Sequence, residues 1–212
     1  MHTMDDESIQ ATRSQLRMGD ANHATTCVDA IASVGFLFIL ASMSSDEILL
    51  AVDPSLRGTG YAILQRSAGK VRCLHFDVIK NTPKLSIPGC LLEIHTRLCD
   101  EVDRFQPTAM AVESVIYVQS FQTAITLGSA RGAVLLAGAM HGLTIYEYAP
   151  RRVKQAVVGR GAAQKSQVAF MVRTLLGLTV TPPPDAADAI AVGLTHFQSP
   201  PTAVRNGHVQ RL

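Results

Sequence analysis

Two continuous apolar runs that each end in an acidic residue constrain the fold of this chain most strongly. Residues 48–53 read ILLAVD, and residues 108–113 read TAMAVE. An uninterrupted apolar run of this length is typical of a strand that is buried on both faces and is therefore central in a sheet. If a helix connects the two strands, they run parallel, and Asp53 and Glu113 then lie at the same edge of the sheet. Open α/β sheets place their functional sites at that edge.

The residues around these runs predict the rest of an α/β domain. A turn follows the first run at 55–60, where Gly58 and Gly60 allow unusual φ angles. A short link at 67–70 favours an antiparallel meander before the first helix. We expect strands at 48–53, 61–64, 71–79, 108–113 and 143–148, and helices at 90–105, 119–141, 150–158, 164–176 and 185–196. The predicted fold class is α/β, with a mixed five-stranded sheet flanked by helices.

One side of the predicted helix at 119–141 consists of small residues, mainly glycine and alanine. Small residues permit another backbone to approach closely. The partner is either the sheet of the same chain or a second subunit, and the sequence alone leaves both interpretations open.

A length of 212 residues suits one domain with additional terminal segments. Residues 1–42 contain five acids and two arginines, and Met43 begins a stretch that reads like a fresh start. We therefore interpret residues 1–42 as a mis-assigned start or a disordered extension. Their apolar run is too short for a membrane span of about 20 residues, and a secretory signal is the less favoured alternative because acids precede it. We expect the folded domain at 43–198 and a flexible tail at 199–212.

The four cysteines show neither a C-x-x-C pair nor the spacing of a metal site. They are Cys27, Cys73, Cys90 and Cys99. Free thiols suit a reducing compartment. The sequence therefore predicts a cytoplasmic protein.

A second pair of acids opens the last predicted helix. Three prolines at 182–184 stop the preceding segment and allow a helix to start, since proline is tolerated in a first turn. Asp185 and Asp188 are three residues apart and share one face of that helix. Taken alone, the pair favours the ordinary interpretation of helix capping and interaction with the helix dipole.

Taken together with Asp53 and Glu113, the pair predicts a metal site. Four carboxylates in one crevice repel one another and raise each other's pKa, and a hard divalent cation removes that cost. Two Mg²⁺ or Mn²⁺ ions roughly 4 Å apart can activate a water and stabilise the leaving oxygen in phosphodiester hydrolysis. The sequence therefore favours a metal-dependent nuclease, most simply with two Mg²⁺ ions per subunit.

A basic stretch downstream fits a substrate with phosphates. Charge alone is equally compatible with a solvated face that has no partner. The basic residues are Arg131, Arg151, Arg152, Lys154, Arg160, Lys165 and Arg173, with Glu147 the single acid among them.

A different function class is suggested by the turn after Asp53, which resembles the phosphate loop of actin-like ATPases and sugar kinases. Those proteins use two such domains, and the folded part of this chain has the length of one. We therefore keep this class as the less favoured alternative.

Motifs in order along residues 47–197 resemble the RuvC Holliday junction resolvases. They are DPS-x-x-x-TGY at 53–61, VESV at 112–115, LG-x-ARG at 127–132, VKQ-x-VVG at 153–159, KSQV at 165–168, MVR-x-LL at 171–176 and DAADA at 185–189. The resemblance implies an RNase H-like fold, a homodimer and Mg²⁺-dependent symmetric nicking of four-way DNA junctions in recombination and repair. It also implies products with 5′-phosphate and 3′-hydroxyl ends and a partnership with a RuvA–RuvB branch-migration motor.

The resemblance also assigns roles to single residues. Its catalytic, metal-binding acids correspond to Asp53, Glu113, Asp185 and Asp188, and its lysines on the DNA backbone to Lys154 and Lys165. We expect Arg131 and Arg152 to be further DNA contacts. A junction-binding module without catalysis is the alternative from another class, and the presence of all four acids argues against it.

One position departs from the family pattern. Family members often place a phenylalanine three residues after the second acid, where it stacks on junction bases, and here that position is Ile116. Tyr117 follows directly. Because stacking needs a π-face, we expect Tyr117 to take this role, with an ordinary loop aromatic as the alternative.

Overall fold

The computed structural model describes residues 46–115, 120–199 and 210–212. Each strand and helix that the sequence predicts has a counterpart in it. The predictions for residues 1–42 and for Ile116 and Tyr117 lie outside the described residues. The elements are β1 (Glu47–Asp53), β2 (Gly58–Ser67), β3 (Lys70–Lys80), α2 (Ile87–Phe105), β4 (Ala109–Glu113), α3 (Phe121–Met140), β5 (Thr144–Tyr148), α4 (Pro150–Val158), α5 (Lys165–Leu176), α6 (Pro184–Gln198) and β6 (Gln210–Arg211).

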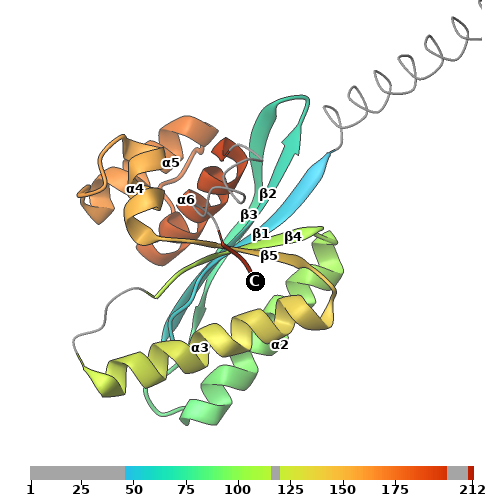
Figure 1. Cartoon of the computed structure of the whole chain (residues 1–212), viewed down its shortest axis with the longest axis vertical. Coiled ribbons are helices and arrows are strands. Elements are labelled where there is room, and N and C mark those ends of the chain that lie inside the picture. The colour runs from blue at the N-terminus through green and yellow to red at the C-terminus, as the bar shows by residue number, and fades with distance from the viewer. Residues whose placement is uncertain (1–45, 116–119, 200–209) are drawn as a thin grey trace, which may run out of the picture. The chain divides into compact units, whose positions relative to one another are not determined.

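The strands form one mixed sheet in the order β3-β2-β1-β4-β5-β6 (Figure 1). β1 pairs parallel with β4, and β4 pairs parallel with β5, whereas β2 and β3 continue the sheet antiparallel. Val52 lies opposite Val112 in the β1–β4 ladder, so Asp53 and Glu113 follow at the same edge. The parallel arrangement predicted from the helix crossover is therefore confirmed.

The sheet has a sixth strand, so the expectation of five strands is corrected by one edge strand. β6 pairs antiparallel with β5, and the backbone N–H of Leu212 donates to the carbonyl oxygen of Ile145 at 3.0 Å. A strand of two residues is too short to show the alternation of apolar and polar residues that predicts a strand. Their pairing depends on the open edge of β5, which exists only in the folded sheet.

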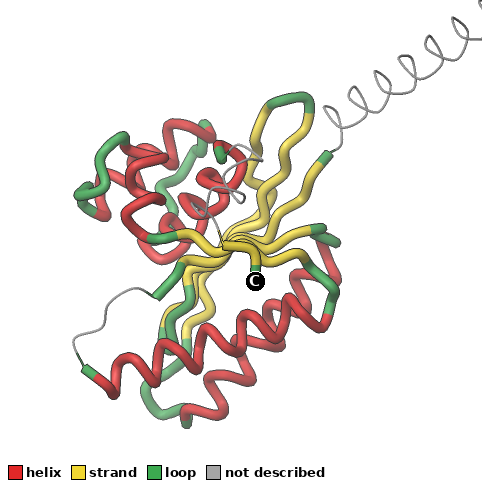
Figure 2. Tube along the Cα trace, viewed as in Figure 1, coloured by secondary structure: helices red, strands yellow, loops and turns green. Residues whose placement is uncertain are grey.

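Two layers of helices cover the two faces of the sheet (Figures 1 and 2). Leu49 and Ala51 belong to the core under α4, α5 and α6, whereas Leu50 and Val52 belong to the core under α2 and α3. Side chains alternate between the faces of a strand. Because both faces are covered, the central strands need apolar residues at every position, which explains their continuous apolar runs.

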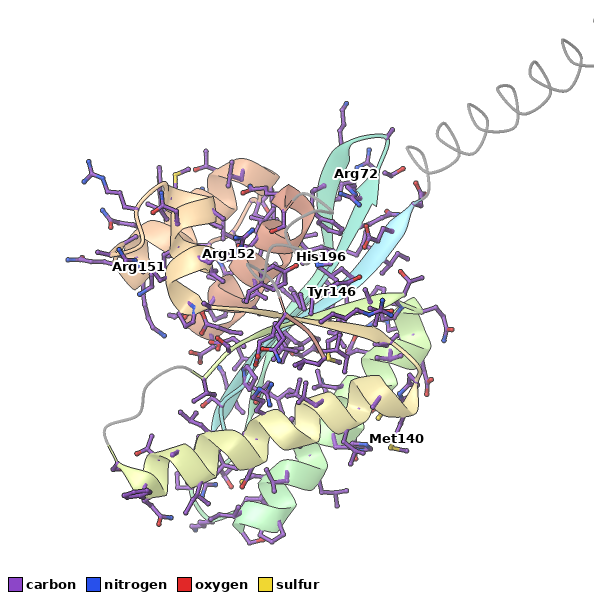
Figure 3. All side chains as sticks on the ribbon, in the orientation of Figure 1. Arg72, Met140, Tyr146, Arg151, Arg152 and His196 are labelled. Carbon is purple, nitrogen blue, oxygen red and sulfur yellow. The ribbon has the colours of Figure 1, made fainter. Side chains whose placement is uncertain are left out.

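Helix α6 packs close to the sheet and is fixed at its far end by a histidine. A Cβ atom at Gly193 would lie 2.4 Å from Leu64 Cδ1, so a larger residue does not fit there. His196 Nδ1 lies 2.8 Å from the Tyr148 hydroxyl, and its Nε2 lies 3.2 Å from Glu47 Oε1. His196 therefore ties the end of α6 to β1 and β5, and Figure 3 shows it beside this part of the sheet.

Helix α2 begins three residues before the expected start. The Ser86 hydroxyl accepts a hydrogen bond from the Gly89 N–H at 3.3 Å and caps the helix. Pro88 lies in the first turn, where its missing N–H costs nothing. The predicted loop at 80–89 is therefore shorter than expected.

Helix α3 is long and apolar enough to cross a membrane by length and composition, the single such helix among the described residues. It packs against α2 within the second core. Its outer side shows an exposed line that we call the α3 stripe, formed by Ile125, Gly128, Gly132 and Leu136. A Cβ atom at either glycine would meet nothing within 4 Å, so the middle of this stripe is open.

Candidate active site

Asp53 and Glu113 end the two central parallel strands and lie side by side. Their carboxyl groups are close enough to hydrogen bond to each other. Burial, together with the negative charges of the neighbouring acids, raises the pKa of Asp53 to about 6 and that of Glu113 to about 8. Both shifts have the same cause, because burial of two neighbouring carboxyl groups disfavours two negative charges there.

Asp185 reaches this edge because two glycines leave room for it. A Cβ atom at Gly60 would lie 1.9 Å from the carbonyl oxygen of Asp185, and one at Gly58 would lie 3.0 Å from its Oδ2. Neither glycine is among the residues with positive φ. The expectation of unusual φ angles is therefore wrong for these two positions, which need glycine because the start of α6 approaches β2 closely.

The acids of α6 do not cap their helix. Pro183 is the N-cap residue, and no side-chain hydrogen bond caps the helix. The charges of Asp188 and Asp185 instead add to burial in raising the pKa of Asp53. The capping part of the interpretation is wrong, whereas Asp185 does lie in the first turn, where the helix dipole favours an acid. Both carboxylates also lie close enough to Asp53 to raise its pKa.

Lys165 lies within this group of acids. Its Nζ is 2.9 Å from Asp188 Oδ2, and the hydrogen bond raises the pKa of Lys165. Its positive charge partly offsets the burial and repulsion that raise the pKa of Asp53. Lys165 is the first residue of α5, so the helix start delivers the ammonium group to the acids.

A groove with a volume of about 490 Å³ opens in front of the sheet edge. It joins the acids of the strands to the basic start of α4, so a phosphate backbone lying along it meets both. The lining residues are Asp53, Pro54, Glu113, Ser114, Val115, Leu127, Pro150, Arg151, Lys154 and Gly161.

Arg151 lines the groove, although we predicted no individual role for it beyond its place in the basic stretch. A Cβ atom at Gly161 would lie 2.7 Å from Arg151 Cγ. Glycine at this position therefore leaves room for the arginine side chain in the groove. Figure 3 labels Arg151 on α4. The sequence signal for this contact is the Gly159-Arg160-Gly161 segment directly after α4.

The two arginines expected to contact DNA are bonded within the protein. Arg131 donates to Glu147 Oε1 from Nε at 2.9 Å and from Nη2 at 2.6 Å. Arg152 Nη2 donates to Ser199 Oγ at 3.0 Å. Neither lines the groove, and their contact with DNA stays a prediction. The predicted stacking role of Tyr117 concerns a residue outside the described part of the chain.

The donor set fits a hard divalent cation, although its members are engaged with one another. Within residues 46–115, 120–199 and 210–212, no three His, Cys, Asp or Glu side chains close on one point as a bound metal requires. Asp53 lies beside Glu113, and Asp188 forms an ion pair with Lys165. Because repulsion and burial raise the pKa of two of these acids, a cation would relieve an existing electrostatic cost once the pairs open.

Comparison with known proteins decides the family. Residues 49–196 match the model of the family described as crossover junction endodeoxyribonuclease RuvC. The chain belongs to the RuvC family. RuvC of Akkermansia muciniphila is 53% identical over 151 residues, which cover 71% of this chain and 90% of the relative. RuvC of Halothermothrix orenii is 42% identical over 153 residues, which cover 72% and 93% of the two chains.

The solved structures agree with this assignment. Thermus thermophilus RuvC in complex with a Holliday junction substrate has a TM-score of 0.69 and 36% identity, and the match covers 78% of this chain and 99% of that chain. The yeast mitochondrial Holliday junction resolvase Ydc2 has a TM-score of 0.50 at 12% identity, with 78% and 86% covered, and shares the fold alone. The predicted RNase H-like fold and endodeoxyribonuclease class are confirmed, and RuvC proteins are metal-dependent nucleases.

Proposed function

We propose that this protein resolves four-way DNA junctions by symmetric nicking that depends on Mg²⁺ and leaves 5′-phosphate and 3′-hydroxyl ends. The observation that supports it most is the meeting of the four acids with a groove lined by Arg151 and Lys154. The Thermus relative was solved with a Holliday junction substrate, and family membership extends that substrate class to this chain.

The described side chains suggest how the work is divided. Arg151 and Lys154 bind backbone phosphates and orient one strand along the groove towards Asp53 and Glu113. Lys165 contributes a further positive charge beside Asp188. Asp53, Glu113, Asp185 and Asp188 would hold two Mg²⁺ ions, or Mn²⁺ in their place, and the bound ions would activate a water and stabilise the leaving oxygen.

Symmetric nicking needs two sites related by a two-fold axis, so we propose a homodimer. The α3 stripe is the surface that fits a second copy. Ile125 and Leu136 are 63% and 54% exposed at its two ends. The two open glycines between them allow a second helix to approach closely, which favours a subunit contact over the alternative of a tight core within one chain.

The remaining partner and the compartment follow from the family and the thiols. We propose the RuvA–RuvB motor as the partner that presents the junction. Cys73, Cys90 and Cys99 are free thiols, which suits the reducing cytoplasm.

The deciding experiment is cleavage of a synthetic mobile four-way junction, compared with a linear duplex of the same sequence. Full-length protein is incubated with Mg²⁺ or with EDTA, and the nicks are mapped on each strand. Asp53→Asn should abolish nicking and keep junction binding, because it removes one carboxylate charge and leaves the phosphate-binding residues intact. Glu93→Gln, an exposed acid on α2, is the matched control and should keep full activity.

Each outcome points to one interpretation. Paired nicks in the junction alone, and with Mg²⁺ alone, support the resolvase. Tight junction binding without nicks by the unchanged protein points to a binding module. Cleavage by Asp53→Asn near the unchanged rate would remove Asp53 from the catalytic set.

A further inference from the structure

Three soft donor atoms meet between α2 and the end of α3, outside the active site. His95 and Cys99 are one helical turn apart on α2, and Met140 is the last residue of α3. His95 Nε2 lies 3.3 Å from Met140 Sδ and 3.7 Å from Cys99 Sγ. Figure 3 labels Met140 at this end of α3. Cys99 Sγ also lies 3.8 Å from His95 Nδ1, so the thiol lies beside the imidazole between its two nitrogens, whereas Met140 Sδ lies beside Nε2.

These separations match the spacing of ligands around a single small metal ion. A metal–nitrogen bond of about 2.0 Å and a metal–sulfur bond of about 2.3 Å place the two donor atoms roughly 3.5–3.7 Å apart at tetrahedral to trigonal angles. The observed nitrogen–sulfur distances of 3.3 and 3.7 Å are within a few tenths of an ångström of this spacing. An ion that binds Nε2 and both sulfur atoms requires the imidazole to rotate so that Nε2 points at the ion between them.

The cluster is open to solvent and rests on a fixed frame. Met140 is 65% exposed, and His95 and Cys99 are half-buried, so an ion can enter from outside. One turn further along α2, Asp103 Oδ1 lies 3.4 Å from His141 Nε2. The two helices are held together by the apolar core that they share, so the donors stand on a packed frame.

The donor chemistry selects the kind of ion. A thiolate and a thioether are soft ligands and favour Cu(I), whereas Mg²⁺ and Ca²⁺ require oxygen donors. Structural zinc sites use four donors from Cys, His or carboxylates. The thioether of Met140 therefore distinguishes this cluster from a zinc site. Sequence spacing gives no signal for it, because Met140 comes from a different helix than the other two residues.

We propose that His95, Cys99 and Met140 form a binding site for one Cu(I) ion, separate from the carboxylates and independent of the proposed resolvase function. On binding, the Cys99 thiol releases its proton to solvent and the sulfur binds the ion without a change of oxidation state. Because the ion bridges α2 and α3, it stabilises the folded chain.

The test is a Cu(I) competition titration of the full-length, reduced protein against bicinchoninate without oxygen. Cys99→Ala and Met140→Leu are compared with Cys73→Ala and Met171→Leu, which remove one sulfur each elsewhere. Loss of an outer-sphere partner typically costs roughly 10- to 100-fold in metal affinity, and loss of a direct ligand should cost at least that. The unchanged protein should bind one equivalent of Cu(I) tightly. Both site variants should lose this tight binding, and both control variants should keep it. X-ray absorption of this equivalent should show one nitrogen and two sulfur neighbours.

The site is overturned if Cys99→Ala keeps the tight equivalent, or if Cys73→Ala removes it to the same degree. An unchanged affinity of Met140→Leu also overturns it, because the ion then does not use the thioether. Far-ultraviolet circular dichroism of the copper-free variants provides the folding control. A variant that is unfolded without copper is replaced by Cys99→Ser, for which the same loss is expected.

Discussion

Lys165 Nζ lies 2.9 Å from Asp188 Oδ2, so the chain places a lysine inside its own group of four acids. The ammonium group sits where positive charge is needed to offset four carboxylates. A divalent cation and Lys165 therefore compete for the same carboxylate, and the lysine must move or share Asp188 when a cation binds.

Replacing Lys165 by methionine should lower the cleavage rate at saturating junction by about 100-fold, because a charge beside the reacting phosphate is lost. The apparent affinity for Mg²⁺ should rise, since Asp188 is freed. Single-turnover rates over a Mg²⁺ titration measure both effects. Lys154→Met is the control, because Lys154 lies in the groove away from Asp188. A Mg²⁺ affinity that falls in Lys165→Met contradicts the competition.

Arg151 and Lys154 should act on binding more than on chemistry. Alanine at either position should weaken junction binding and reduce the slope of log affinity against log salt by about 1, because one phosphate contact is lost. Gly161→Val should weaken binding as well, since it displaces the Arg151 stem. Fluorescence anisotropy between 50 and 300 mM salt is the measurement. Lys70→Ala, at the exposed start of β3, should leave the slope unchanged, and an unchanged slope in Arg151→Ala excludes a phosphate contact.

The stability of the metal-free protein should depend on pH through Asp53 and Glu113. Burial and repulsion raise the pKa of Asp53 from 3.8 to about 6 and that of Glu113 from 4.5 to about 8. Between these limits the folded state binds more protons than the unfolded state, so the free energy of unfolding falls as pH rises. In EDTA, the melting temperature of the unchanged protein should therefore drop by roughly several degrees more than that of Glu113→Gln between pH 5 and 8.5.

Excess Mg²⁺ at pH 8.5 should restore most of this loss in the unchanged protein, because the ion binds the deprotonated acids of the folded state alone. Glu93→Gln should follow the unchanged protein in both conditions. Identical pH profiles for Glu113→Gln and the unchanged protein show that these acids are not linked to folding.

Gly60→Ala should damage folding and cleavage together. Its Cβ would lie 1.9 Å from the Asp185 carbonyl oxygen, so α6 must shift away from β2. Overpacking of this kind costs about 1–3 kcal/mol of unfolding free energy, and the shift also moves Asp185 and Asp188. Urea denaturation and junction cleavage measure the two effects. Gly58→Ala should be milder, because it meets a side-chain oxygen at 3.0 Å, and equal stability of both variants contradicts the close packing.

Phe121 is 91% exposed at the start of α3, close in sequence to Val115 of the groove. We predict that it stacks on a junction base, alone or beside Tyr117. Phe121→Ala should then weaken the free energy of junction binding by about 1–3 kcal/mol. It should also abolish the fluorescence change that 2-aminopurine at the junction centre shows on protein binding. Phe170→Ala, with 64% exposure on α5, is the control. A loss confined to Tyr117→Ala assigns the stacking to that residue instead.

The fold was largely readable from the sequence because its signals are local. Two apolar runs predict the central strands, and the acids at their ends predict the edge of the sheet where the candidate site lies. Contacts between segments that are distant in the sequence could not be predicted from it. Three contacts join different elements: Lys165 with Asp188, Gly60 with Asp185, and Gly161 with Arg151. The type of a residue alone predicts neither its partner nor the distance between them. Strand β6 was not predicted for the same reason, because it forms by pairing with β5, which is distant in the sequence.

The close approach of α6 to β2 also bears on how the protein is made. Asp53 and Glu113 leave the ribosome early, whereas Asp185 and Asp188 lie near the end of the folded domain. An incomplete polypeptide therefore holds half of the acids and lacks the helix that brings the rest to the sheet. If the four acids act together as we propose, a chain that ends before α6 lacks two of them and has no nuclease activity.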